Sequence, residues 1–210
     1  LGDEIFLSLL PLSHSYEHTC GLYFPISIGA QIYYAEGPDK VAQNLQEAKP
    51  TIMTAVPRLY EALHDRIQRG VQQSGGLKKY LFDLTLELGR KERVEKKPLS
   101  LTEKLSNMLV DHAVRTKVSQ RFGGRLKAFV SGGAALNPDI GNFFLSLGVN
   151  ILQGYGQTEA SPIISCNRPG NIRIETVGPA LKDVEIKIAE DGEILVRGEL
   201  VMKGYWKDPV

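Results

Sequence analysis

The stretch Val149-Asn150-Ile151-Leu152-Gln153-Gly154-Tyr155-Gly156-Gln157-Thr158-Glu159 decides how this chain is interpreted. An apolar, strand-like run ends in a predicted turn with two glycines, and open α/β sheets hold their ligands where strands end in such turns. The turn would present the Tyr155 ring to a base, the Thr158 hydroxyl to a phosphate oxygen and the Glu159 carboxylate to Mg²⁺. By spacing alone, the segment also fits a tight turn with an incidental exposed glutamate.

A second glycine-rich segment, Ser131-Gly132-Gly133-Ala134, follows directly on a predicted strand at 126–130. Two adjacent glycines let the backbone approach a flat ligand, because no Cβ intervenes. The alternative is a strand-to-helix turn in which Asn137 caps the next helix. Two glycine-rich strand ends in one sheet favour a shared ligand crevice.

Outward from these segments, strands and helices alternate between about residues 5 and 165. We predict strands at 5–10, 31–35, 51–56, 126–130 and 149–152, and helices at 17–28, 41–48, 57–71, 77–91, 101–122 and 138–147. This alternation predicts an α/β fold with a mostly parallel sheet layered with helices.

Beyond Pro169 the pattern changes to period two. Residues 184–188 and 193–197 alternate around Asp191-Gly192, which is a strong hairpin signal. We therefore expect an α/β part at 1–168 and the start of a small antiparallel β subdomain at 169–210.

The segment His14-Ser15-Tyr16-Glu17-His18 matches an inverted zinc-peptidase pattern, in which two histidines hold Zn²⁺ and a glutamate acts as base. Pro11 and Ser13 instead place His14 on a loop or at a helix N-terminus, where a shared helix face is not assured. The other interpretations are a histidine that lines a pocket and a histidine that makes structural hydrogen bonds.

Composition excludes several function classes. The 210 residues carry a net charge of +1, which predicts no attachment to nucleic acid or to an anionic membrane by charge alone. Two cysteines, Cys20 and Cys166, fit neither a disulfide framework nor a cysteine-rich zinc site, so a cytoplasmic location is expected. The longest apolar candidate, residues 22–35, is interrupted and too short for a membrane span.

In order and spacing, four blocks resemble the adenylate-forming (AMP-binding) superfamily. They are Leu10-Pro-Leu-Ser-His14, Ser131-Gly-Gly-Ala134, Gly154-Tyr-Gly-Gln-Thr-Glu159 and Gly192-Glu-Ile-Leu-Val-Arg-Gly198, the last leading to Gly204-Tyr205. The long helical stretch between Gly70 and Gly124 is most similar to bacterial long-chain fatty acid–CoA ligases.

The resemblance implies a two-step reaction with ATP, Mg²⁺ and coenzyme A. A fatty acid carboxylate attacks the α-phosphate of ATP to give acyl-AMP and pyrophosphate, and the CoA thiol then displaces AMP. Adenylation of an aryl or amino acid is the close alternative. The zinc peptidase and a non-catalytic nucleotide-binding relative are the alternatives from other classes.

The resemblance also assigns roles to residues. Gly132, Gly133 and Ala134 would lie along the adenine, on which Tyr155, between Gly154 and Gly156, would stack. Thr158 would contact the phosphate and Glu159 would hold Mg²⁺. His14 would border the acyl pocket near the reacting carboxylate, and His18 would stand near the entrance of the acyl tunnel.

The family's phosphate loop would precede Leu1, and its ribose-binding Asp and C-terminal lysine domain would follow Val210. We therefore expect the chain to be the central part of a longer enzyme and to be inactive by itself. Because fatty acids partition into bilayers, peripheral contact with the inner membrane face is also an expectation, although the sequence shows no clear amphipathic anchor. Chain-length preference and oligomeric state are left open.

Overall fold

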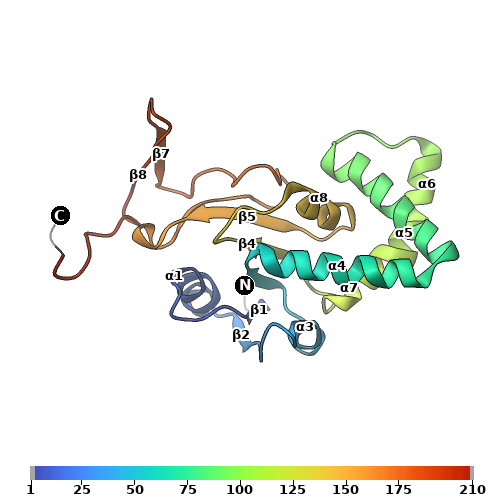
Figure 1. Ribbon diagram of the computed structural model, residues 1–210, viewed down its shortest axis with the longest axis horizontal. Helices are drawn as coiled ribbons and strands as arrows, with labels where there is room; N and C mark the ends of the chain where they lie inside the picture. Colours follow the sequence, from blue (N-terminus) through green and yellow to red (C-terminus); the bar gives the residue numbers. More distant parts are fainter. Residues whose placement is uncertain (1–2, 209–210) are drawn as a thin grey trace.

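The computed structural model describes residues 3–208 and contains a six-stranded sheet in the order β2-β1-β3-β4-β5-β6 (Figure 1). The strands are β1 (Ile5–Ser8), β2 (Gln31–Tyr34), β3 (Ile52–Ala55), β4 (Ala128–Ser131), β5 (Ile151–Gly156) and β6 (Ile163–Cys166). The first five are parallel and β6 is antiparallel to β5, which confirms the predicted mostly parallel sheet.

The glycine-rich stretch after Leu152 differs from its prediction. It continues β5 instead of ending it, with Gly154 opposite Cys166 and Gly156 opposite Ile163 across a register shift. A Cβ on Gly156 would lie 1.7 Å from the Pro162 carbonyl oxygen. The glycines therefore allow β6, a strand that the sequence pattern did not predict, to approach closely.

Helices fill the predicted intervals with different boundaries. They are α1 (Ser15–Glu17), η1 (His18–Tyr23), α2 (Phe24–Ser27), α3 (Val41–Ala48), α4 (Pro57–Ser74), α5 (Gly76–Gly89), η2 (Arg90–Val94), α6 (Leu101–Val110), η3 (Asp111–Arg115), α7 (Thr116–Arg121), α8 (Pro138–Ser146) and the short 3₁₀ turn η4 (Thr158–Ala160). The first three form one helical run, in which η1 is a π-helical segment. The predicted helix at 101–122 is likewise interrupted by the π-helical η3.

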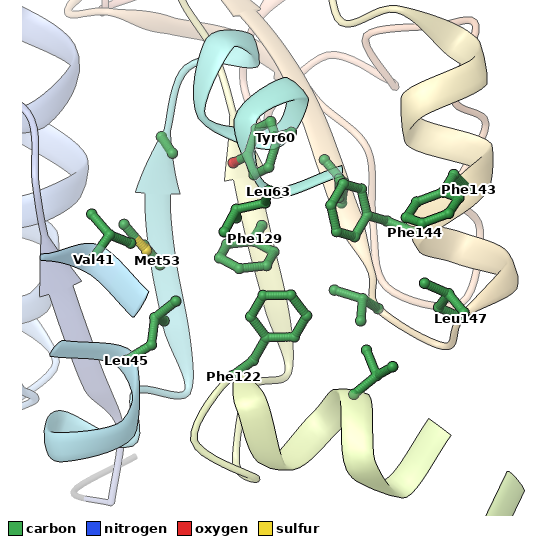
Figure 2. Close-up of a cluster of buried hydrophobic side chains, with 14 of the residues drawn as sticks. Val41, Leu45, Met53, Tyr60, Leu63, Phe122, Phe129, Phe143, Phe144 and Leu147 are labelled. Atoms are coloured by element: carbon green, nitrogen blue, oxygen red, sulfur yellow. The ribbon is translucent and has the colours of Figure 1, made fainter. Parts of the chain in front are cut away.

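The main core lies between the sheet and helices α3, α4, α7 and α8 (Figure 2). Its centre is aromatic, with the ring of Phe129 on β4 packing edge-on against Tyr60 and Phe122 at centroid distances of 5.4 Å each. Edge-to-face packing of this kind is favoured over stacked faces by the ring quadrupoles. The core thus fixes β4, whose end carries one of the two predicted ligand segments.

After β6, the chain packs against the α/β part once more before it reaches the β7–β8 hairpin. Ile172 and Ile174 are buried in a cluster with Ala128, Leu145 and Leu152. The Gln153 side chain accepts a hydrogen bond from the Leu136 backbone N–H (2.6 Å) and donates to the Ile174 carbonyl (3.1 Å). These contacts attach residues 172–174 to β5.

The predicted hairpin is confirmed. Strands β7 (Glu185–Ile188) and β8 (Ile194–Arg197) form a separate two-stranded antiparallel sheet, and Gly192 takes the positive φ of +90° that its turn requires. No helix within residues 3–208 is both long and apolar enough to cross a membrane.

Candidate active site

A cavity of about 210 Å³ opens at the carboxyl ends of β4 and β5, next to the start of α1. Parallel strands present these ends at one edge of the sheet, which is where α/β folds bind ligands. The cavity is lined by His14, Ser15, Tyr16, Val130, Ser131, Gly132, Gly133, Gly154, Tyr155, Gly156, Gln157, Thr158, Pro162, Ile163 and Cys166. The predicted shared crevice is therefore present.

Long-range hydrogen bonds join the segment after His14 to β4 and to the turn η4 that follows β5. The Ser15 and Thr158 hydroxyl oxygens lie 2.9 Å apart. The Tyr16 hydroxyl donates to the Val130 carbonyl at 3.0 Å, and the Tyr60 hydroxyl donates to the same carbonyl at 2.9 Å. Burial raises the pKa of Tyr16 well above its usual value, so the phenol keeps the proton that it donates.

His14 caps the first helical run, as one of the sequence interpretations predicted. Its Nδ1 accepts a hydrogen bond from the Tyr16 backbone N–H at 3.1 Å. A neutral imidazole that accepts at Nδ1 carries its proton on Nε2. The exposed His14 ring therefore offers one N–H donor at the rim of the cavity.

The glycines at this edge line the cavity and also allow close packing. A Cβ on Gly132 would lie 3.1 Å from Cζ of Tyr16, and Gly133 has a φ of +82°. Ala134 is exposed and lies outside the cavity lining. The Ser131 hydroxyl at the cavity wall is buried and has no hydrogen-bond partner among residues 3–208, so hydrogen-bonding capacity remains at this wall.

Tyr155 and Thr158 both line the cavity, whereas Glu159 lies just beyond it. The Gln157 side-chain N–H donates to the Tyr155 hydroxyl at 3.1 Å. The Tyr205 hydroxyl donates to Oε1 of Glu159, and the Glu159 carbonyl accepts from the Met202 backbone N–H at 2.9 Å. The hydrogen bond from Tyr205 lowers the pKa of Glu159 and raises the pKa of Tyr205.

Glu159 fits a magnesium ligand on two observations. Its lowered pKa favours the ionised carboxylate, and within residues 3–208 the Tyr205 hydroxyl is the only side-chain group that hydrogen-bonds to it. Mg²⁺ prefers such hard oxygen donors and binds through one or two carboxylates together with substrate phosphates.

The zinc-peptidase arrangement of His14, Glu17 and His18 is not formed. Glu17 is fully buried and accepts hydrogen bonds from the Ser8 and Thr54 hydroxyls, at 2.6 and 2.7 Å. Its burial raises the pKa of the carboxyl group, which the hydrogen bonds only partly offset. In the described part of the chain, no three His, Cys, Asp or Glu side chains are placed to hold a metal ion.

His18 is separate from the cavity. Its Nδ1 lies 3.0 Å from the Leu12 carbonyl, and its ring packs edge-on against Tyr23 at 4.8 Å. The residues that sequence reasoning missed include Ser15, Tyr16 and Cys166 of the cavity lining and Tyr205, the partner of Glu159. The first two adjoin His14 and could have been included with it, whereas Cys166 and Tyr205 arrive through tertiary contacts that no local pattern reports.

Known proteins resemble this chain over its whole length. Residues 1–206 match the family described as AMP-binding enzyme. Long chain acyl-CoA synthetase 7, peroxisomal, of Arabidopsis thaliana is 30% identical, covering 98% of this chain and 31% of the relative. The putative fatty-acid–CoA ligase fadD11 of Mycobacterium tuberculosis is 33% identical, covering 99% of this chain and 37% of the relative. The chain thus spans about a third of the length of these relatives.

Solved structures share the fold. A long-chain-fatty-acid-CoA ligase (FadD1) from Archaeoglobus fulgidus superposes with a TM-score of 0.62 at 20% identity, covering 99% of this chain and 36% of that one. A benzoate CoA ligase from Burkholderia xenovorans LB400 superposes with a TM-score of 0.63 at 24% identity, covering 99% and 35%. Together with the sequence match over residues 1–206, the fold and the blocks that line its cavity show that this chain belongs to the AMP-binding enzyme family.

Proposed function

We propose that this chain is the central part of an enzyme that activates a fatty acid as acyl-AMP and transfers it to CoA. The observation that carries the proposal is the convergence of His14, Gly133, Tyr155 and Thr158 on one cavity in an AMP-binding fold. The similarity to proteins named as long-chain acyl-CoA synthetases and fatty-acid–CoA ligases supports a fatty acid as the substrate.

The cavity is suited to one portion of the nucleotide. Its volume of about 210 Å³ is below the roughly 300–1,000 Å³ of sites that enclose a whole drug-sized ligand. We assign the adenine to the backbone of Gly132 and Gly133, with its face on Tyr155 between Gly154 and Gly156. Ala134 would contact it only from beyond the cavity lining. The free hydrogen-bonding capacity of Ser131 lies at the same wall.

The phosphate side of the site would be formed by Thr158 and Glu159. The Thr158 hydroxyl lies 2.9 Å from that of Ser15 and would donate to a phosphate oxygen while Ser15 donates to it. Glu159 would hold Mg²⁺, which, when bound, offsets the charge of the phosphates as one anion approaches another. The Tyr205 hydroxyl lowers the pKa of Glu159 and so favours the ionised carboxylate that this role requires.

His14 would act at the acyl side. Because its Nδ1 is occupied by the Tyr16 N–H, its Nε2–H is the group that faces a ligand. A donor in this position can orient the attacking carboxylate and stabilise charge that develops near the α-phosphate. His18, beyond the cavity, would stand nearer the entrance of the acyl chain.

We also propose that this chain alone does not catalyse the adenylation reaction, since relatives of the same family are about three times as long. Purified residues 1–210 should show no acid-dependent exchange of pyrophosphate into ATP. Exchange by this chain that is lost in Glu159→Ala would contradict the proposal.

The test of function is acid-dependent exchange of labelled pyrophosphate into ATP by the full-length protein, with fatty acids of increasing length beside aryl and amino acids. Exchange with long-chain acids is the expected result. Exchange restricted to aryl acids would keep the adenylation chemistry and replace the substrate, a result that the structural likeness to a benzoate CoA ligase makes worth including. No exchange with any acid would favour a non-catalytic nucleotide-binding relative.

A further inference from the structure

Helix α6 presents its apolar face to solvent. Leu101, Leu105, Met108 and Leu109 are between 64% and 85% exposed, and their spacing of three and four residues places them on one side of the helix. The opposite side carries the buried Asn107 and Val110. Surface helices normally have the reverse arrangement, with polar residues outward.

Polar contacts fix α6 in this orientation. The Asn107 side chain donates to Oε2 of Glu92 at 3.1 Å and accepts from Nη1 of Arg115 at 2.7 Å. Arg115 is itself buried and donates to the Ser146 and Thr85 carbonyls at 3.2 Å each. Turning the apolar face inward would leave these groups without partners, so the outward apolar face is a stable feature of the fold.

The segment around α6 is also basic. Residues 76–121 contain eleven Lys and Arg against six Asp and Glu, a net charge of +5, whereas the whole chain has a net charge of +1. Nearby acids are already neutralised, because Glu103 pairs with Lys91, Asp111 with Arg115 and Glu95 with Lys97. Two exposed lysines of the same segment, Lys96 and Lys104, have no ion pair within residues 3–208.

The α6 face is remote from the candidate active site. In Figure 1, α5 and α6 lie at the end of the molecule opposite the β7–β8 hairpin. None of the four exposed apolar residues lines the nucleotide cavity. A surface in this position can contact a partner without blocking the crevice at β4 and β5.

We propose that the outward face of α6 docks on a phospholipid bilayer that bears anionic headgroups. An apolar helix face in a basic segment lies in the membrane interface because it buries apolar side chains among the acyl chains and attracts anionic lipid. The use of such contact rests on the proposed function, since a fatty acid substrate partitions into the bilayer. The docking itself rests on the exposure and charge of α6.

A second copy of this chain fits the face less well than a bilayer. Specific protein interfaces bury about 800 Å² on each partner, and the outward face of one ten-residue helix is small by comparison. Pairing two copies through α6 would also bring together two segments that each carry a net charge of +5. An anionic bilayer avoids both problems, because its surface is not limited in area and its charge is opposite to that of the α6 segment.

The test is cosedimentation of the full-length protein with vesicles of phosphatidylcholine alone and vesicles enriched in phosphatidylglycerol. We expect binding to the anionic vesicles, weakened by added salt, and a partition coefficient reduced about tenfold or more in Leu105→Gln/Met108→Gln. The matched control is Ile186→Gln/Ile188→Gln, which removes two exposed apolar side chains from β7 and should bind like the wild type. Equal binding by the α6 variant and the wild type would overturn the proposal.

A thiol at Leu109 separates the bilayer from the other occupants. In Leu109→Cys, the new thiol should be labelled rapidly by a maleimide in solution and protected by anionic vesicles, with the wild type giving the background from Cys166. Protection without vesicles, in a monomer or in a dimer, would show that protein covers the face and would overturn the proposal. Vesicle binding is measured without substrate, so its failure is distinct from failure of pyrophosphate exchange.

Discussion

The crevice at β4–β5 and the helical segment α5–α6 are built in opposite ways. In the crevice, two of the important groups are fixed by residues far away in the sequence: Ser15 contacts Thr158, and Tyr205 contacts Glu159. In α5–α6, much of the order is local, with a capping box at Ser100 and a Lys79–Asp83 pair one turn apart. The difference teaches that a crevice for a compact ligand depends on tertiary contacts that position its groups. A helix such as α6, which forms largely from local signals, can leave its whole apolar face without a partner.

The largest effect should come from breaking the crevice at its proposed metal ligand. Glu159→Ala should lower acid-dependent pyrophosphate exchange by about 10²–10³, because one preorganised stabiliser of the reacting phosphate is lost. Glu193→Ala, at an exposed turn of the β7–β8 hairpin, is the matched control and should exchange normally. An active Glu159→Ala protein would contradict the metal-site role.

Two glycine substitutions, one at the crevice and one in α4, test how closely the crevice is packed. Gly156→Ala should destabilise the protein by about 2–3 kcal/mol, because the new Cβ would lie 1.7 Å from the Pro162 carbonyl oxygen and β6 must shift. Gly70→Ala, inside α4 with nothing within 4 Å of the added methyl, should instead stabilise by about 0.5–1 kcal/mol. Denaturant unfolding of both variants measures the signs, and a neutral Gly156→Ala would contradict close β5–β6 packing.

In the helical segment, the local cap should matter moderately. Ser100→Ala removes the hydroxyl that accepts from the Glu103 backbone N–H and should cost about 1 kcal/mol in denaturant unfolding, with pyrophosphate exchange unchanged. Lys104→Ala, at an exposed position of the same helix, is the control and should stay within about 0.5 kcal/mol of the wild type. A loss of exchange in Ser100→Ala would show that the two regions are coupled.

The smallest effect should be a change in pH dependence. Because the Tyr205 hydroxyl lowers the pKa of Glu159, Tyr205→Phe should let that pKa rise towards its usual value of 4.5. The carboxylate would then be protonated at a higher pH, so the acid limb of the exchange rate should move upward in pH with little change near pH 7. If the acid limb of the exchange rate stays at the same pH in Tyr205→Phe, Tyr205 does not lower the pKa of Glu159.

Much of the fold followed from the sequence, whereas the site followed only in part. The Asp191-Gly192 hairpin was predicted because its signal lies within a few residues. The Asn137 cap, which was the alternative interpretation of the segment after Ser131, is also present. Strand β6 was missed because the glycines before it were interpreted as a turn. The zinc pattern failed because residue spacing does not report that Glu17 turns into the sheet towards Ser8 and Thr54.

The sequence by itself determined the alternation of strands and helices, the glycine positions and the ordered blocks of an AMP-binding enzyme. These depend on local periodicity, turn chemistry and residue type. Only the tertiary structure decided that Tyr205 holds Glu159, that Ser15 contacts Thr158, and that α6 turns its leucines outward. The physical reason is that a side chain's partner is set by which distant segments pack together, and in α6 the buried Asn107–Arg115 contact prevails over the usual preference for apolar burial.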